Sequence, residues 1–112
     1  MKKILMILMI SMMLCACGDG PDKFDLKSVM AEKEYMIIDV RTEEEYDSAH
    51  VVGAINIPYD EIEGNINLDI NKNIFVYCKS GNRSKIAFNE LTRLGYTVYD
   101  LGAFEDIDLA KE

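Results

Sequence analysis

The sequence predicts an α/β domain in which a parallel sheet lies between two layers of helices. Apolar strand segments alternate with segments of helical periodicity, and this alternation is typical of βαβ units. In addition, residues 35–40, apart from Asp39, and residues 74–77 are continuously apolar, as in strands that are buried on both faces of a parallel sheet. The chain has 112 residues, which is enough for one small domain. We therefore expect a three-layer α/β/α architecture.

The first predicted elements of the domain are short. Residues 23–26 are expected to form an edge strand, and a short helix follows it. The apolar face of that helix carries Leu26, Val29 and Met30. The buried strand at residues 35–40 comes next.

A capping box predicts the start of the next helix. Thr42 is placed to cap it and Glu45 stands three residues further on, so the helix should begin after Thr42 and end near Ala49. We interpret the acidic run at residues 43–45 as a solvated first turn, which suits the helix dipole. Another short strand is expected at residues 54–57.

The C-terminal half is expected to contain one or two helical turns within residues 60–68, a buried strand at residues 74–77, a helix and a last strand at residues 97–99. The apolar positions of that helix are Ile86, Ala87, Leu91 and Leu94. Gly95 is placed to end the helix in the left-handed conformation.

A polar loop lies between the apolar strand and this helix, and it begins at Cys78. Such a loop directs backbone N–H groups inward, and the helix dipole adds positive potential. Gly81 permits a turn with positive φ, while Lys79 and Arg83 add charge. We therefore predict that Cys78 ionises readily and is a nucleophile in an anion-binding loop. The predicted binding residues are Lys79, Ser80, Gly81, Asn82, Arg83 and Ser84.

Three motifs together resemble the rhodanese-domain sulfurtransferase family. The loop at residues 78–84 reads CKSGNRS, which is similar to the active-site loop of that family. Residues 37–58 resemble its first signature, with IIDVR, EY, a histidine and GAINIP in the expected order. The third motif is LGY followed by VYDLG within residues 94–102. The resemblance covers residues 25–107 and is specific because the three motifs occur together.

The resemblance implies a five-stranded sheet with the strand of the active-site loop at its centre. It also implies that Asp39 and Arg41 lie near the active-site end of the sheet and brace its loops, with Arg41 near the substrate. His50 belongs to a turn in the family motif and is expected to be structural. The sequence departs from the family at Ala49, where the family has glycine. It departs again at residues 102–104, which read GAF in place of two glycines and a tryptophan.

The favoured function is sulfur transfer, as the resemblance implies. The Cys78 thiolate would take a sulfane sulfur from thiosulfate or a similar donor, and the persulfide would pass it to a thiol or to cyanide. No metal or cofactor is implied. A phosphatase or arsenate reductase is less favoured, because those enzymes have C-x5-R whereas four residues separate Cys78 from Arg83. A non-catalytic binding module of the same fold is the other alternative.

The N-terminal residues resemble a bacterial lipoprotein signal. Two lysines precede an apolar run at residues 4–14, which is too short to span a bilayer. Residues 14–17 read LCAC and resemble a lipobox. That resemblance implies a signal peptide over residues 1–16 and attachment of lipid, with palmitate among its acyl chains, at Cys17.

The mature protein is therefore expected to be anchored to the cell membrane, with its domain on the extracytoplasmic side. Residues 17–22 would be the tether and residues 23–112 the rhodanese-like domain. The formal net charge of −8 offers no electrostatic footprint for nucleic acid. With Cys15 removed and Cys17 acylated, Cys78 would be the remaining thiol, so neither a disulfide nor a zinc site is expected. We also expect a monomer.

Overall fold

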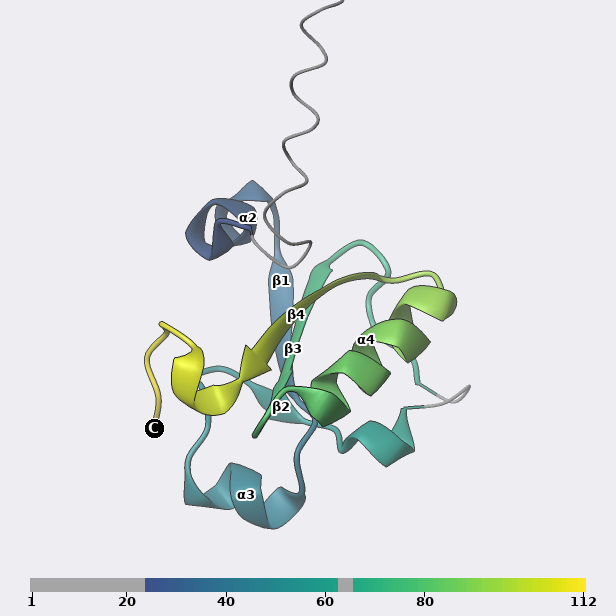
Figure 1. Cartoon of the computed structure of the whole chain (residues 1–112). Helices are drawn as coiled ribbons and strands as arrows, with labels where there is room; N and C mark the ends of the chain where they lie inside the picture. Colours follow the sequence, from purple (N-terminus) through teal and green to yellow (C-terminus); the bar gives the residue numbers. More distant parts are fainter. Residues whose placement is uncertain (1–23, 63–65) are drawn as a thin grey trace, which may run out of the picture.

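The computed structural model describes residues 24–62 and 66–112, and its core is a parallel sheet (Figure 1). The four described strands are ordered β2-β1-β3-β4, and every neighbouring pair is parallel. They are β1 (Tyr35–Asp39), β2 (Ile55–Asn56), β3 (Asn73–Cys78) and β4 (Thr97–Ala103). The carboxyl ends of the strands lie at one edge of the sheet, which is where α/β proteins bind their ligands.

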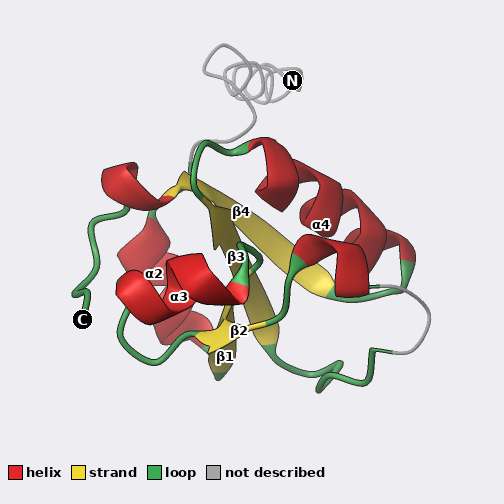
Figure 2. Ribbon diagram, turned by 90° about the horizontal axis from the view of Figure 1, so that it is seen from below, coloured by secondary structure: helices red, strands yellow, loops and turns green. Residues whose placement is uncertain are grey.

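Helices cover both faces of this sheet, as Figure 2 shows. Helix α4 (Asn82–Arg93) lies on one face, and α2 (Leu26–Glu32) and α3 (Glu43–Ser48) lie on the other. The predicted α/β fold with a parallel sheet between two helical layers is therefore confirmed.

Two hydrophobic clusters fill the spaces between the layers. Ile38, Val76 and Leu91 belong to the cluster beneath α4, whereas Val29 and Phe75 belong to the cluster on the opposite face. Successive residues of a strand point to opposite faces. The central strand β3 therefore serves both clusters, and all six of its residues are buried. This position explains why its sequence is continuously apolar rather than alternating.

The edge strand predicted at residues 23–26 is wrong for the described part of that segment, residues 24–26, since Lys23 lies outside it. Asp25 is instead the N-cap of α2, and its carboxylate accepts hydrogen bonds from the Ser28 hydroxyl at 2.8 Å and the Ser28 N–H at 3.5 Å. An aspartate before an amphipathic segment stabilises the helix start, and this local effect decides the structure here. The described sheet accordingly has four strands rather than five.

The capping box predicted for α3 is confirmed. The Thr42 hydroxyl accepts a hydrogen bond from the Glu45 N–H at 3.2 Å, and the Glu45 carboxylate accepts one from the Thr42 N–H at 3.0 Å. Gly95 also has the predicted positive φ, at 102°, immediately after α4. The prediction that Ile86 belongs to the apolar face of α4 is wrong, because 52% of its surface is exposed.

The remaining boundaries differ modestly from those predicted. Within the described part of residues 60–68 there is one short 3-10 helix, η1 (Tyr59–Glu61), and residues 63–65 lie outside the description. The last strand is longer than residues 97–99, because β4 continues to Ala103. A second 3-10 helix, η2 (Phe104–Asp106), follows it directly.

The end of β4 carries an irregularity that shapes the loop edge of the sheet. The register shifts so that Val76 pairs with Asp100 but Tyr77 pairs with Gly102. Gly102 has a φ of 82°, and its N–H donates to the Asp100 carboxylate at 2.9 Å. The residue of β4 that this register shift skips forms a β-bulge. The bulge bends the strand and places Ala103 beside the end of β3.

The predicted N-terminal features lie outside the described residues. These are the signal peptide over residues 1–16, with Cys15 in it, the lipid attachment site Cys17 and the tether over residues 17–22. Among the described residues, none of the helices has the length and apolar character needed to cross a membrane.

Candidate active site

Cys78 is the last residue of β3 and stands at the carboxyl edge of the sheet. The chain then turns through Gly81, which precedes α4 and has a φ of 99°. This left-handed conformation favours glycine, so the predicted positive φ is confirmed. A Cβ built on Gly81 would lie 4.0 Å from the Cα of Gly102, so the bulged end of β4 supports the loop.

The sulfur of Cys78 is enclosed by the loop that follows it. Its Sγ accepts hydrogen bonds from the Gly81 N–H at 3.0 Å and from the Ser84 N–H at 3.3 Å. The Ser84 hydroxyl donates to the Gly81 carbonyl at 3.2 Å and closes the turn. Cys78 has no exposed surface. The first turn of α4 and the loop thus direct their free N–H groups at the thiol, as expected for a helix N-terminus.

This environment favours the thiolate. Burial of Cys78 opposes ionisation, but hydrogen bonds from Ser84, Gly81 and Ser80 outweigh it and hold the pKa of the thiol below its ordinary value. Hydrogen bonds to the charged form lower the pKa of an acid, and a lowered pKa is characteristic of reactive cysteines.

Arg83 does not lie free in the loop, because it forms an ion pair with Glu45 of α3. Its two terminal nitrogens donate to the two carboxylate oxygens at 2.9 and 3.2 Å, and both side chains are half-buried. The interpretation of residues 43–45 as a purely solvated turn is therefore wrong at Glu45. The hydrogen bonds from Arg83 outweigh partial burial and lower the pKa of the Glu45 carboxyl to about 2.

Three other predicted loop residues are exposed, namely Lys79, Ser80 and Asn82. Lys79 forms no ion pair with another residue of the described chain. It borders a cavity of about 250 Å³ next to the loop. That cavity is lined by Arg41, Glu45, Ser48, Ala49, Lys79, Phe104 and Glu105.

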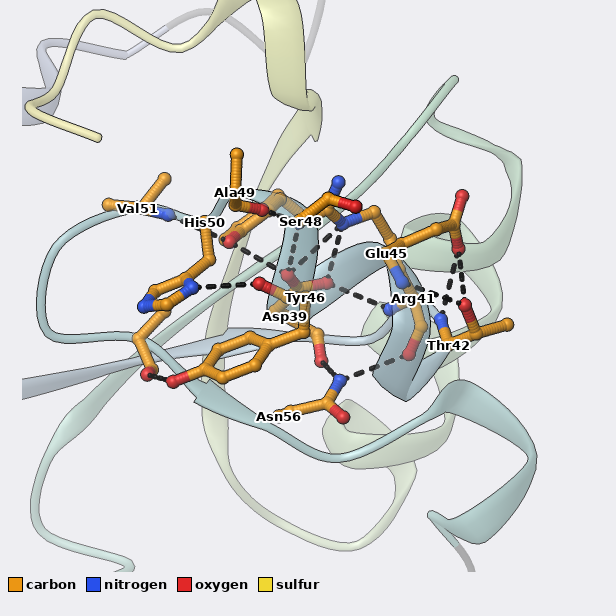
Figure 3. Close-up of polar contacts among 12 residues, drawn as sticks. Asp39, Arg41, Thr42, Glu45, Tyr46, Ser48, Ala49, His50, Val51 and Asn56 are labelled. Carbon is orange, nitrogen blue, oxygen red and sulfur yellow. Dashed lines mark hydrogen bonds and ion pairs between the residues drawn. The ribbon is translucent and has the colours of Figure 1, made fainter. Parts of the chain in front are cut away.

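Asp39 and Arg41 form a buried ion pair at the end of β1 (Figure 3). The Arg41 Nε donates to both carboxylate oxygens, at 2.9 and 3.0 Å, and Nη2 donates to one of them at 2.6 Å. Nη2 also donates to the carbonyl of Ala49 at 2.6 Å, just beyond α3. The amide of Asn56 ties the same region to β2 through the carbonyls of Asp39 and Arg41, each at 3.0 Å.

Two aromatic residues of the site were not predicted from the sequence. The Tyr77 hydroxyl donates to the Asp39 carboxylate at 2.9 Å and accepts from the Val51 N–H at 3.0 Å, and burial raises its pKa. Phe104 stacks on the Tyr77 ring and lies 4.4 Å from the Arg41 guanidinium. A tyrosine in a fully buried strand is a usable signal, because its hydroxyl needs a partner.

His50 contacts residues outside the cysteine loop. Its ring stacks on Tyr46 at 3.9 Å and its Nδ1 lies 2.8 Å from the Tyr46 carbonyl. Its Nε2 lies 3.3 Å from the Glu112 carboxylate, and the two backbones exchange hydrogen bonds. None of these contacts involves Cys78. Cys17, the predicted lipid attachment site, lies outside the described residues.

A cysteine loop between a central parallel strand and a helix, with a buried aspartate–arginine pair at the end of the neighbouring strand, defines an α/β domain of the rhodanese class. The family model described as "Rhodanese-like domain" matches residues 23–108, and the chain therefore belongs to this family. This assignment supports a sulfurtransferase activity in general terms.

Particular relatives agree with the family. The thiosulfate sulfurtransferase PspE of Escherichia coli (strain K12) is 42% identical over 78 residues, which cover 66% of this chain and 75% of PspE. The putative sulfur carrier protein YrkF of Bacillus subtilis (strain 168) is 37% identical over 71 residues, covering 62% of this chain and 38% of YrkF.

Solved structures give the same result. A rhodanese with anions from E. coli superimposes with a TM-score of 0.64 at 38% identity, covering 70% of this chain and 96% of that one. A rhodanese-like domain protein from Staphylococcus aureus has a TM-score of 0.62 at 31% identity, covering 76% of this chain and 89% of that one.

Proposed function

We propose that the protein is a sulfurtransferase that carries sulfur as a persulfide on Cys78. The observation that supports this most directly is the pair of N–H groups from Gly81 and Ser84 that donate to Sγ at 3.0 and 3.3 Å. Such preorganised donors stabilise a sulfur anion without reorganisation during the reaction. The likeness to PspE, a thiosulfate sulfurtransferase, supports thiosulfate or a similar molecule as the donor.

The first step of the proposed reaction forms the persulfide. The Cys78 thiolate attacks the outer sulfur of thiosulfate, and the bond between the two thiosulfate sulfurs breaks. Sulfite leaves with that electron pair, so no proton transfer is needed. The N–H groups of the loop then stabilise the negative outer sulfur of the persulfide.

The second step discharges the persulfide. Cyanide, or the thiolate of a small thiol, attacks the outer sulfur and the Sγ–S bond breaks. Thiocyanate or a new persulfide leaves, and the Cys78 thiolate is restored with its own electron pair. This two-step scheme is covalent catalysis in which Cys78 is the nucleophile.

The enclosure of Cys78 has a consequence for this mechanism. Because Cys78 has no exposed surface, a donor reaches Sγ only after a rearrangement of the residues that cover it. Lys79 and Asn82 are exposed and available to contact the donor as it enters. We propose the loop residues at positions 79–84 as the binding residues, and we propose Asp39 and Arg41 as supporting residues of the site.

The mass of the protein after incubation with thiosulfate tests this function. We expect Cys78 to gain one sulfur atom, cyanide to remove it, and the Cys78→Ser variant to gain none. If the mass of the wild-type protein stays unchanged with thiosulfate and with low-molecular-weight persulfides, the non-catalytic binding module becomes the better assignment. Release of phosphate or reduction of arsenate without sulfur transfer would favour the third alternative.

We also propose that the protein is a lipoprotein held at the extracytoplasmic face of the cell membrane. The proposal rests on the lipobox-like residues 14–17 and the short apolar run before them. Two or more acyl chains are needed for stable anchoring, since one chain binds only marginally. Metabolic labelling with a palmitate analogue should mark the membrane fraction of the wild-type protein, and Cys17→Ala should abolish both the label and the membrane association.

A further inference from the structure

Glu45 has a placement that neither the capping motif nor the cysteine loop explains alone. As the N3 residue of α3 it accepts the Thr42 N–H, and the same carboxylate accepts both terminal nitrogens of Arg83. Arg83 lies 38 residues further along the chain and is the residue immediately before Ser84, whose N–H donates to Sγ of Cys78. The ion pair therefore joins α3 to the segment that holds the sulfur.

The charges around the loop are largely paired. Arg41 is neutralised by Asp39 and Arg83 by Glu45, which leaves Lys79 as the cation without an ion-pair partner among the described residues at the site. Hydrogen bonding to Glu45 is the main cause that raises the pKa of Arg83, and the charge of Cys78 contributes less. Arg83 thus faces two negative groups, and Glu45 dominates.

We propose that Glu45 is a positioning residue that sets how strongly the Cys78 site attracts an anionic reagent, by holding and neutralising the guanidinium of Arg83. This inference rests on the proposed function for its meaning, because thiosulfate is an anion. Removing the negative charge of Glu45 leaves the positive charge of Arg83 uncompensated in the segment that encloses the sulfur. An opposite charge at such a site attracts the entering anion, whereas a neutral reagent is affected far less.

Alkylation of Cys78 by two reagents of different charge tests the proposal. The rate constants for iodoacetate, an anion, and iodoacetamide, which is neutral, are measured at Cys78 by peptide mass spectrometry on the full chain. Their ratio cancels changes in accessibility and in thiolate population that affect both reagents alike. In Glu45→Gln the ratio of iodoacetate to iodoacetamide should rise about three- to tenfold. Glutamine at N3 retains the capping interaction, so the variant should fold.

Glu44→Gln is the matched control. Glu44 lies in the same first turn of α3 and is exposed, whereas the ion pair with Arg83 is formed by Glu45. The Glu44→Gln substitution removes the same charge from the same end of α3. The ratio of the iodoacetate to the iodoacetamide rate constant in this variant should therefore equal that of the wild type. In an Arg83→Gln background the Glu45→Gln substitution should return the ratio toward that of the wild type, because neither charge of the pair then remains. Arg83→Gln alone should lower the ratio, since it leaves Glu45 without its cation.

Two outcomes would overturn the proposal. One is a ratio in Glu45→Gln equal to that in Glu44→Gln, and the other is a ratio in Arg83→Gln that does not fall below that of the wild type. Neither measurement uses a sulfur donor, so the proposal is tested separately from the proposed function. If the wild-type protein forms no persulfide but the alkylation ratio still rises in Glu45→Gln, sulfur transfer is contradicted while the role of Glu45 is retained.

Discussion

The thiol of Cys78 combines two features that would act against each other in the proposed nucleophile. Its pKa is lowered mainly by hydrogen bonds from Ser84, which overcome the effect of burial, but its surface is completely covered. The local motif was sufficient to predict the lowered pKa, because the donors all lie within six residues of the sulfur. The enclosure was not predicted, since it depends on how β4 and α4 pack around the loop.

The lowered pKa gives an expected pH dependence at the residue scale. The rate of alkylation of Cys78 by iodoacetamide should reach half of its plateau at a lower pH than that of an ordinary cysteine. The reason is that the thiolate reacts and it persists to lower pH in the folded protein. The same titration in denaturant should move to the ordinary value. A midpoint at or above the ordinary value in the folded protein would contradict the assignment of Cys78 as an activated thiol.

Gly81 allows a second test at this scale. Gly81→Ala places a side chain at a φ of 99°, which should cost roughly 1–2 kcal/mol of unfolding free energy and shift the N–H that faces Sγ. We expect lower stability in denaturant titration together with a higher pKa of Cys78.

The matched control for Gly81 is Gly53→Ala. Gly53 has a φ of 87° and, like Gly81, has space for a Cβ, but it lies in a different turn. It should lose similar stability while the pKa of Cys78 stays unchanged. Equal effects of the two substitutions on that pKa would show that the N–H of Gly81 has no special role.

At the scale of secondary-structure elements, the sequence predicted a contact between nearby residues but not a contact between distant ones. The capping box of α3 lies within four consecutive residues, and the sequence predicted it correctly. The strand predicted at residues 23–26 was wrong because Asp25 caps α2, and this local interaction favours a helix start. The partner of Glu45 could not be predicted, since Arg83 is 38 residues away and meets it only when α3 and α4 are docked.

The ion pair between α3 and α4 predicts a specific dependence of stability on pH. The pKa of the Glu45 carboxyl is lowered in the folded protein from 4.5 to about 2. The stabilisation is therefore fully present above pH 4.5 and is lost as the pH falls through about 2. The difference in unfolding free energy between the wild type and Glu45→Gln should be constant above about pH 5 and should shrink below it.

Denaturant titrations over that pH range measure this difference, and Glu44→Gln is again the comparison. Glu44 forms no ion pair with another described residue, so its substitution should not reproduce the effect of Glu45→Gln. A difference between the wild type and Glu45→Gln that stays constant down to pH 2 would contradict an ion pair of this strength.

For the whole molecule, the formal net charge of −8 opposes an approaching anion. Screening by salt weakens this long-range repulsion, because the Debye length falls to about 8 Å at 0.15 M ionic strength. The rate of persulfide formation from thiosulfate at low donor concentration should therefore rise about two- to fivefold from about 10 mM to about 150 mM ionic strength. Alkylation by neutral iodoacetamide should not change. A rate that falls with salt would mean that Lys79 and Arg83 dominate the field at the site.

The sequence by itself determined the class of the fold, the position of the cysteine loop between a strand and a helix, and the start of α3. These features depend on hydrophobic pattern, on turn and cap chemistry, and on donors that lie close along the chain. The tertiary structure alone decided the burial of Cys78, the Tyr77–Asp39 hydrogen bond, the position of Phe104 and the pairing of Glu45 with Arg83. Each of these features depends on residues that are distant in sequence. Such residues come into contact only when the strands are arranged in the sheet and β4 has formed its bulge. The hydrophobic periodicity of a sequence does not predict such contacts, because it indicates which face of an element is buried and not which residues pack against that face.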